Sequence, residues 1–107
     1  MRNALRMQAV PYRAPGRLLP KRRRGLRAGS VILRPGASMP RHSTKEREEL
    51  IVALAGRVHI EVEDARGRRG HIALSEGRCV LLPPRTPHTV TNRSTRAARY
   101  LYVTGRK

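Results

Sequence analysis

The segment from Gly77 to Asn92, GRCVLLPPRTPHTVTN, restricts the fold of this chain more than any other stretch. It holds a short apolar run, then three prolines within five positions, and then a second run that opens with His88. Prolines fix the φ angle and remove backbone donors, so the turn between the two runs has few available conformations. A proline-rich turn beside a β run is typical of a sheet edge or a barrel rim. We therefore predict that His88 is held in a defined position at the start of a strand.

A second group of polar residues lies upstream, between two glycines. The first glycine is followed after five residues by a histidine, and a glutamate seven positions later is followed after six residues by the other glycine; these are Gly36, His42, Glu49 and Gly56. The histidine opens the triplet His42-Ser43-Thr44. If the triplet is extended, His42 and Thr44 point to the same side, because alternate residues of a strand share a face.

Together, the two segments resemble the motifs of the cupin family. The first family motif reads glycine, five residues, His-x-His, three or four residues, glutamate, six residues, glycine. The second reads glycine, five residues, proline, one residue, glycine, two residues, histidine, three residues, asparagine. Every spacing is matched, and two residue types differ: Thr44 stands at the second histidine and Arg85 at the inner glycine of the second motif. The resemblance covers residues 36–92, about half of the chain. It implies a small single-domain cupin, with an all-β double-stranded β-helix, or jelly-roll barrel.

The resemblance also implies a metal site in the barrel mouth, with His42, Glu49 and His88 as ligands. Two imidazoles and one carboxylate form a 2-His-1-carboxylate set, which leaves coordination positions open for a substrate or for oxygen. Nitrogen and oxygen ligands suit Fe, Mn, Ni, Zn or Co, and the sequence does not select among these divalent ions.

Thr44 leaves a second interpretation open. A threonine hydroxyl is a poor ligand compared with imidazole, so the site is either a three-ligand metal site or a metal-free pocket. In the metal-free pocket, the same three residues would hydrogen-bond to one another around a small polar ligand. Glu48, next to Glu49, offers an alternative register. The six-residue gap to Gly56 favours Glu49, and alternation turns Glu48 to the other face.

Composition favours one small domain built of strands. The chain has 107 residues with no Trp and no Phe, so its core must consist of Val, Ile, Leu and Ala, and β-branched residues favour strands. The single cysteine, Cys79, excludes an internal disulfide, and we predict that it is buried. No apolar run approaches the ~18 residues of a membrane span, and the N-terminus lacks the apolar segment of a secretion signal. We predict a cytoplasmic protein.

The chain carries a formal net charge of +17, and 21 of its 24 basic residues are arginine. Residues 1–41 hold eleven basic residues and no acidic one. Such a charge favours binding to nucleic acid or another polyanion through phosphates. Nucleic-acid modules usually add stacking aromatics or a recognisable motif, which are missing here, so we expect nonspecific binding at most. We divide the chain into a basic N-terminal arm or edge strand, residues 1–27, and a barrel domain, residues 28–107.

Alternation and turn signals predict at least six short strands and no helix, with strands at 30–33, 49–55, 58–63, 70–74, 79–82, 88–92 and 97–104. The polar segment 40–48 is predicted to be a loop. ELIVALA, residues 49–55, is apolar on both faces after its first residue. Its second face must therefore be covered by the other sheet or by a partner subunit. On this basis we predict a homodimer.

Four further residues are candidates for the wall of a ligand pocket: Thr44, Arg85, Tyr100 and Tyr102. The tyrosines offer hydroxyl donors, and arginine at the rim favours an anionic ligand. The resemblance implies a small-molecule metalloenzyme, of dioxygenase or isomerase type, that acts on a small anionic or sugar-like compound. The alternative is a metal-free module that binds or senses a small ligand without turnover. The sequence does not decide between these functions.

Overall fold

The computed structural model describes residues 9–19 and 25–106, which form strands and no helix. The all-β class predicted from the sequence is confirmed. The strands are β1 (Gly16–Arg17), β2 (Leu26–Leu33), β3 (Ser38–Ser43), β4 (Arg47–Ala55), β5 (Arg57–Glu63), β6 (Arg69–Ser75), β7 (Cys79–Leu82), β8 (Pro87–Thr91) and β9 (Ala98–Arg106).

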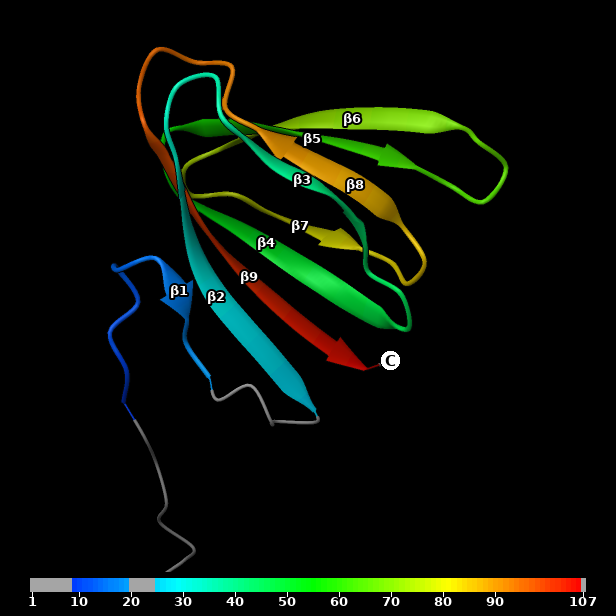
Figure 1. Ribbon diagram of the computed structural model, residues 1–107, viewed down its shortest axis with the longest axis horizontal. Coiled ribbons are helices and arrows are strands. Elements are labelled where there is room, and N and C mark those ends of the chain that lie inside the picture. The colour runs from blue at the N-terminus through cyan, green and yellow to red at the C-terminus, as the bar shows by residue number, and fades with distance from the viewer. Residues whose placement is uncertain (1–8, 20–24, 107) are drawn as a thin grey trace, which may run out of the picture.

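The strands form two antiparallel sheets that face each other as two layers (Figure 1). One sheet has five strands in the order β1-β2-β9-β4-β7, and the other has four in the order β3-β8-β5-β6. The chain passes from one sheet to the other between β2 and β3, between β3 and β4, and between β4 and β5. It also crosses between β6 and β7, between β7 and β8, and between β8 and β9, so most sequence neighbours lie in opposite sheets and the two motifs of the sequence meet between them.

The core lies between the sheets and consists mainly of branched aliphatic side chains. Because successive side chains of a strand point to opposite faces, each strand contributes every second residue. In β5, for example, Val58 and Ile60 are almost fully buried, whereas Glu61 is exposed. The buried hydrophobic residues are Val31, Leu33, Ile51, Ala53, Val58, Ile60, Leu74, Leu82, Val90, Ala98 and Tyr100.

The predicted loop over residues 40–48 is confirmed only for residues 44–46, and the prediction was wrong for the residues on either side. The segment Ser38–Ser43 is strand β3, which pairs with β8, and β4 begins already at Arg47. The sequence SMPRHS shows no apolar alternation because β3 is an edge strand: its partner on one side only is β8, and most of its side chains are exposed. An edge position also tolerates Pro40, which has no backbone N–H to donate.

The prediction of a buried Cys79 was also wrong. Cys79 is exposed, and so is Leu81, whose exposure is 58%. In β7 it is Leu82 that enters the core, at 4% exposure, so alternation places residues 79 and 81 on the outer face. A run of four apolar residues does not reveal which of its faces is inside.

Motif glycines occupy turns that need a left-handed backbone. Gly36, Gly56 and Gly77 all have positive φ angles, of 82°, 72° and 86°. At Gly56 a side chain is excluded twice, because a Cβ atom would also lie 2.9 Å from the carbonyl oxygen of Ala97. The glycine spacing of the sequence therefore marks real turns between strands.

The N-terminal arm is only partly described. β1 pairs with β2 through Gly16 and Arg17, residues 9–12 form no strand, and residues 1–8 lie outside the described residues. The basic run at 21–24 also lies outside them. Among the residues that are described, no helix is long and apolar enough to cross a membrane. The cytoplasmic location stays a prediction.

Candidate metal centre and its cavity

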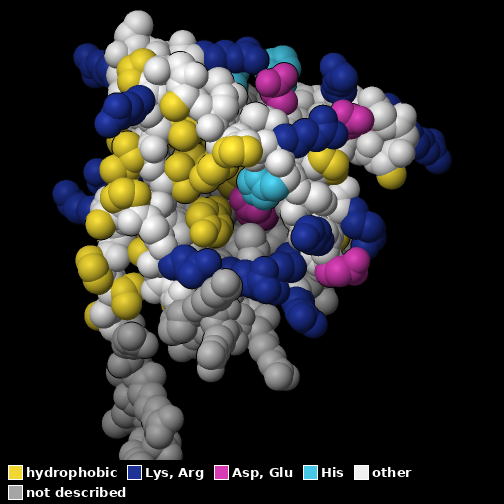
Figure 2. Space-filling view, in the orientation of Figure 1, with side chains coloured by type: hydrophobic (Ala, Val, Ile, Leu, Met, Phe, Trp, Pro, Cys, Tyr) yellow, Lys and Arg dark blue, Asp and Glu magenta, His cyan; other side chains and the backbone are white. Residues whose placement is uncertain are grey.

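Three strands bring the three predicted ligands together. His42 on β3 and His88 on β8 are direct partners in the antiparallel register, and Glu49 comes from β4 in the opposite sheet. One nitrogen or oxygen atom of each residue lies within 4.8 Å of those of the other two. Figure 2 shows a histidine and an acidic side chain inside the central hollow, with a band of basic side chains below them.

Backbone carbonyls fix the tautomer of both histidines. The Nδ1 atom of His88 lies 2.9 Å from the carbonyl oxygen of Thr86, and that of His42 lies 3.0 Å from the carbonyl oxygen of Pro40. A carbonyl oxygen only accepts, so each Nδ1 must carry the hydrogen and donate it. In the neutral imidazole the lone pair is then on Nε2, which is the usual arrangement of a metal-binding histidine.

The Nε2 atom of His88 faces a carboxylate. It lies 3.6 Å from Oε2 of Glu49, and it is buried with no hydrogen-bond partner among the described residues. The side chain of His88 is 0% exposed and that of Glu49 is 7% exposed. Two electron-rich atoms in a buried space require a cation or a proton between them.

The charges around His88 favour a positive species there. Burial on its own lowers the pKa of the imidazole, but the neighbouring Glu49 carboxylate and the Thr86 carbonyl outweigh burial, so the pKa of His88 is raised. The same field that favours a proton on Nε2 also favours a metal ion at that position.

Thr44 is buried at 5% exposure and lines the cavity. Its Oγ1 donates a hydrogen bond to the carbonyl oxygen of Pro83 at 2.8 Å and accepts one from the backbone N–H of Thr86 at 3.0 Å. The hydroxyl therefore links the β3–β4 loop to the proline turn that precedes His88. At the place of the second motif histidine, this chain has a side chain that holds the turn.

A cavity of about 590 Å³ is lined by His42 and Glu49, whereas His88 is not part of its lining. Tyr100 and Tyr102 both line it. Burial raises the pKa of Tyr100 far above its ordinary value, and the nearby Glu49 and Tyr102 raise it further, so its hydroxyl stays protonated. The ring of Tyr102 lies directly over Gly29, where a Cβ atom would overlap it. The two tyrosines thus form a wall that can donate hydrogen bonds.

Four basic side chains also line the cavity. They are Arg17, Arg27, Lys45 and Arg47. Arg47 is held in place, because its Nε donates to Oγ1 of Thr104 at 2.9 Å and a terminal nitrogen donates to the carbonyl oxygen of Gly25 at 3.2 Å. Sequence reasoning missed Arg27 and Arg47, although Arg47 lies two positions before Glu49 and alternation places both on one face.

Arg85 does not line this cavity. Its side chain is 72% exposed and forms an ion pair with Glu46, with 3.8 Å between nitrogen and oxygen. Its backbone has a φ angle of +55°, in the left-handed region that favours glycine. This explains physically why the motif has a glycine at this position. The guanidinium of Arg85 lies in solvent.

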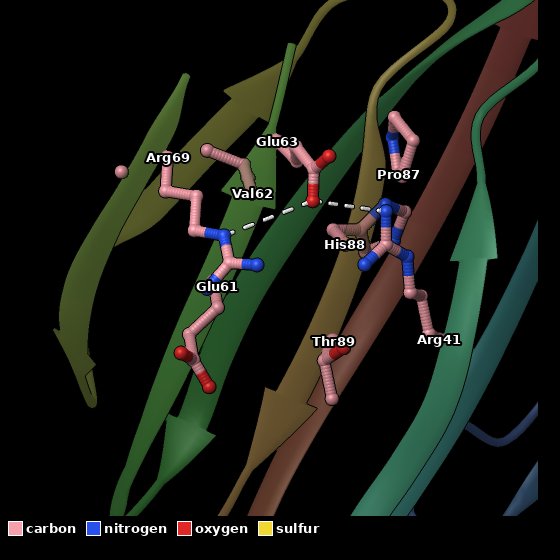
Figure 3. A pocket seen from close by; sticks show the side chains of 9 residues that line it. Arg41, Glu61, Val62, Glu63, Arg69, Pro87, His88 and Thr89 are labelled. Atoms are coloured by element: carbon pink, nitrogen blue, oxygen red, sulfur yellow. Dashed lines mark hydrogen bonds and ion pairs between the residues drawn. The ribbon is translucent and has the colours of Figure 1, made fainter. Parts of the chain in front are cut away.

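A second hollow, of about 190 Å³, lies on the outer face of the four-stranded sheet (Figure 3). Its charges already compensate one another: the carboxylate of Glu63 accepts a hydrogen bond from Arg41 at 3.2 Å and lies 3.9 Å from Arg69. The other acidic residue of its lining, Glu61, lies 3.4 Å from Arg93, so both carboxylates of this hollow are already in ion pairs with arginine.

A family profile described as "Cupin domain" matches residues 29–104, which is more than half of the chain. The chain belongs to the cupin family. This confirms the resemblance found in the two motifs. No curated protein matches the sequence.

Solved cupin structures share the jelly-roll fold of this chain. The Cnp3 cupin domain of Schizosaccharomyces pombe is 18% identical, with a TM-score of 0.73 over 87% of this chain and 60% of that one. An oxalate oxidase is 15% identical, with a TM-score of 0.72 over 77% of this chain and 42% of that one. Bacillus subtilis oxalate decarboxylase, which has Mn(II) centres, is 23% identical, with a TM-score of 0.70 over 78% and 22%. This cupin spans at most 60% of these chains, and at such identities the likeness shows the fold alone.

Proposed function

We propose that this cupin binds a divalent metal ion through His42, Glu49 and His88, and holds a small anionic compound in the adjoining cavity. One observation carries the proposal: the buried Nε2 atom of His88 has no hydrogen-bond partner among the described residues and faces the Glu49 carboxylate. Both histidines donate from Nδ1 to carbonyls, so both Nε2 atoms are free to coordinate. The donor set suits Fe, Mn, Ni, Zn or Co.

The cavity supports an anionic ligand. Arg17, Arg27 and Lys45 line it, and a strongly basic protein attracts anions over a distance. The hydroxyls of Tyr100 and Tyr102 can donate hydrogen bonds to oxygen atoms of a carboxylate or a sugar. When bound, a divalent ion supplies a Lewis acid for such an oxygen. On this proposal the protein is a small-molecule metalloenzyme of dioxygenase or isomerase type, because three protein ligands leave coordination positions open.

Elemental mass spectrometry of the untagged protein, purified without chelator, tests the metal site. The test compares the natural protein with His42→Ala, which removes the exposed ligand. The matched control is His71→Ala, a variant at an exposed histidine on β6 outside the site. We expect near-stoichiometric metal in the natural protein and in His71→Ala, and loss of metal in His42→Ala. The proposal fails if the natural protein stays metal-free after incubation with Fe(II), Mn, Ni and Zn.

The second candidate is a metal-free module that binds or senses a small ligand. The raised pKa of His88 favours it, because a proton on Nε2 would also satisfy the Glu49 carboxylate. Calorimetric titration with oxalate, used as a simple dianion, separates the two functions. If the chelator-treated protein binds oxalate as tightly as the zinc-loaded protein does, the metal-free function is favoured. Binding that requires zinc favours the metalloprotein.

A further inference from the structure

The cavity beside the proposed metal site has an excess of positive charge. Four basic side chains line it, and Glu49 is the only acidic residue in the part of its lining that the structure describes. The carboxylate of Glu49 already faces the imidazole of His88, with 3.6 Å between oxygen and nitrogen. Positive charges that converge in a partly enclosed space repel one another unless an anion lies between them. The cavity therefore has a place for a second negative charge besides that of Glu49.

The strand register shows where these positive charges lie. Glu49 on β4 and Arg27 on β2 both pair with Thr104 on the intervening strand β9, so the three residues form one row across the sheet. Arg47 lies two positions before Glu49 on the same face of β4. Its Nε donates to Oγ1 of Thr104 at 2.9 Å, and a terminal nitrogen donates to the carbonyl oxygen of Gly25 at 3.2 Å. The guanidinium of Arg47 therefore extends across β9 toward β2, the strand that carries Arg27.

Arg47 and Arg27 differ in what they can offer to a ligand. Arg47 is buried at 8% exposure, and burial together with the positive charges of Arg27 and Arg106 lowers its pKa. It is a fixed positive charge at this end of the cavity. Arg27 is exposed, and its side chain forms no ion pair within the described part of the chain. Its guanidinium donors can therefore bind an anion in the cavity.

The spacing of the two ends limits which ligand can reach both. The Cα atoms of Arg47 and Glu49 are about 7 Å apart along β4, and those of Arg27 and Glu49 are about 10 Å apart across two strand spacings. The cavity wall also contains apolar groups, among them Met39 and the ring of Tyr102. Figure 2 shows hydrophobic side chains beside the basic band in the same hollow. A ligand that contacts both ends must therefore carry its two polar groups several bonds apart.

We infer that the cavity takes a small compound with two polar ends: an oxygen group at the metal side, next to Glu49, and a separate phosphate or carboxylate at Arg27 and Arg47. The metal end belongs to the proposed function, on which this inference rests. The middle of the compound packs against Met39 and Tyr102. Oxalate, whose two carboxylates are directly bonded, reaches only one end. Phosphate and carboxylate share the feature that a guanidinium recognises, which is a pair of acceptor oxygens with negative charge.

Phosphate binding tests the arginine subsite without the metal. Inorganic phosphate is titrated by calorimetry into chelator-treated, desalted protein at physiological salt, which screens weak attraction to the net charge. Arg27→Met removes the exposed guanidinium and should weaken phosphate binding about tenfold. Arg78→Met removes the same charge at an exposed residue that does not line the cavity, and it should bind normally. Circular dichroism confirms that both variants are folded. A natural protein that binds no phosphate, or an equal loss in both variants, overturns the subsite.

Ligand length is tested on the zinc-loaded protein. Adipate has a carboxylate at each end of a methylene chain, hexanoate has a chain of the same length with one carboxylate, and succinate has two carboxylates closer together. Adipate should bind at least about tenfold more tightly than the other two, and Arg27→Met should remove its advantage over hexanoate. The phosphonate analogue of adipate distinguishes the two anions: tighter binding than adipate assigns phosphate to the subsite, and weaker binding assigns carboxylate. Equal binding of adipate and hexanoate overturns the two-ended ligand.

Failure of the arginine subsite is distinguishable from failure of the metal site. A protein that takes up no zinc contradicts the metal site, whereas phosphate binding that depends on Arg27 still supports the subsite. A protein with stoichiometric zinc keeps the metal site, but the inference is overturned if its Arg27→Met variant binds phosphate and adipate as the natural protein does.

Discussion

Replacing Thr44 by valine tests whether its hydroxyl holds the turn before His88. The hydroxyl donates to the carbonyl of Pro83 at 2.8 Å and accepts from the N–H of Thr86 at 3.0 Å. Valine keeps the shape of the side chain and removes both hydrogen bonds. Thr86 is 8% exposed, so its N–H loses its acceptor in a buried place, whereas Pro83 is exposed and its carbonyl can bond to water.

The expected loss of stability follows from the buried donor. An unsatisfied buried group costs about 1–3 kcal/mol, so Thr44→Val should lower the free energy of unfolding by about 2 kcal/mol. In a domain of this size 1 kcal/mol corresponds to roughly 4–8 °C, and the metal-free variant should unfold about 8–16 °C lower. Thr44→Ser is the matched control. It keeps the hydroxyl and loses one buried methyl group, worth about 0.8 kcal/mol.

The expected loss of metal affinity follows from the hydrogen bond between the imidazole of His88 and the carbonyl oxygen of Thr86. Thr86 accepts the Nδ1 hydrogen of His88 at 2.9 Å, so a displaced turn moves the imidazole away from Glu49. Removing the hydrogen-bond partner of a metal ligand costs about 10–100-fold in affinity. Thr44 acts one contact further away, and we expect a loss of about tenfold for Zn²⁺ in Thr44→Val and little loss in Thr44→Ser.

Two measurements check this prediction. Thermal unfolding followed by circular dichroism, with chelator present, reports the stability of the metal-free protein, because bound metal would raise the melting temperature by mass action. Competition with a chromogenic zinc chelator gives the affinity. If Thr44→Val melts at the same temperature as the natural protein and binds Zn²⁺ equally well, the hydroxyl does not hold the turn, and the reasoning is refuted.

Three further predictions concern backbone and charge. Gly29→Ala should collide with the ring of Tyr102 and destabilise the fold by about 1–3 kcal/mol, with a change in tyrosine fluorescence; unchanged fluorescence and stability would contradict the close contact. Arg85→Gly should relieve the +55° φ angle and stabilise the protein by up to about 1 kcal/mol in urea unfolding; a loss of stability would count against strain there. Asp64 accepts from the backbone N–H of Arg68, which lowers its pKa. Its contribution is therefore present above the unfolded-state pKa of about 4 and lost as the pH falls through the folded-state value, and Asp64→Asn should flatten the acid limb of a pH–stability curve.

Much of the fold could be predicted because an alternation of apolar and polar residues indicates a strand directly from the sequence. The predicted strand 58–63 corresponds to β5, and 79–82 coincides with β7. Motif spacing located the turns because only a few residue types adopt a positive φ angle, as Gly36 and Gly77 do. The motif histidines and the motif glutamate lie close together because the turns return the chain from one sheet to the other.

The errors have a physical cause in common. Strand β3 lies at a sheet edge, where most side chains are exposed and polar residues are as compatible with a strand as apolar ones. Its sequence therefore shows no periodic alternation of apolar and polar residues. Cys79 lies in an apolar run that alternation divides between core and surface. Which half is inside depends on the opposite sheet, and the sequence of one strand does not contain that information.

The two departures from the family motifs lie on facing loops that are bonded to each other. The backbone N–H of Arg85 donates to the carbonyl of Lys45 at 2.7 Å, and the N–H of Thr44 lies 3.4 Å from the carbonyl oxygen of Thr86. Lys45 and Arg85 both have φ angles of +55°, so strain is present on each side of the contact. The hydrogen bonds of the Thr44 hydroxyl join the same loops, which offsets that strain and fixes the turn before His88. A fourth nitrogen or oxygen ligand at position 44 would have to give up these bonds. On the proposed function, two histidines and one carboxylate would therefore bind the metal, while Thr44 at the fourth motif position keeps the turn before His88 in place.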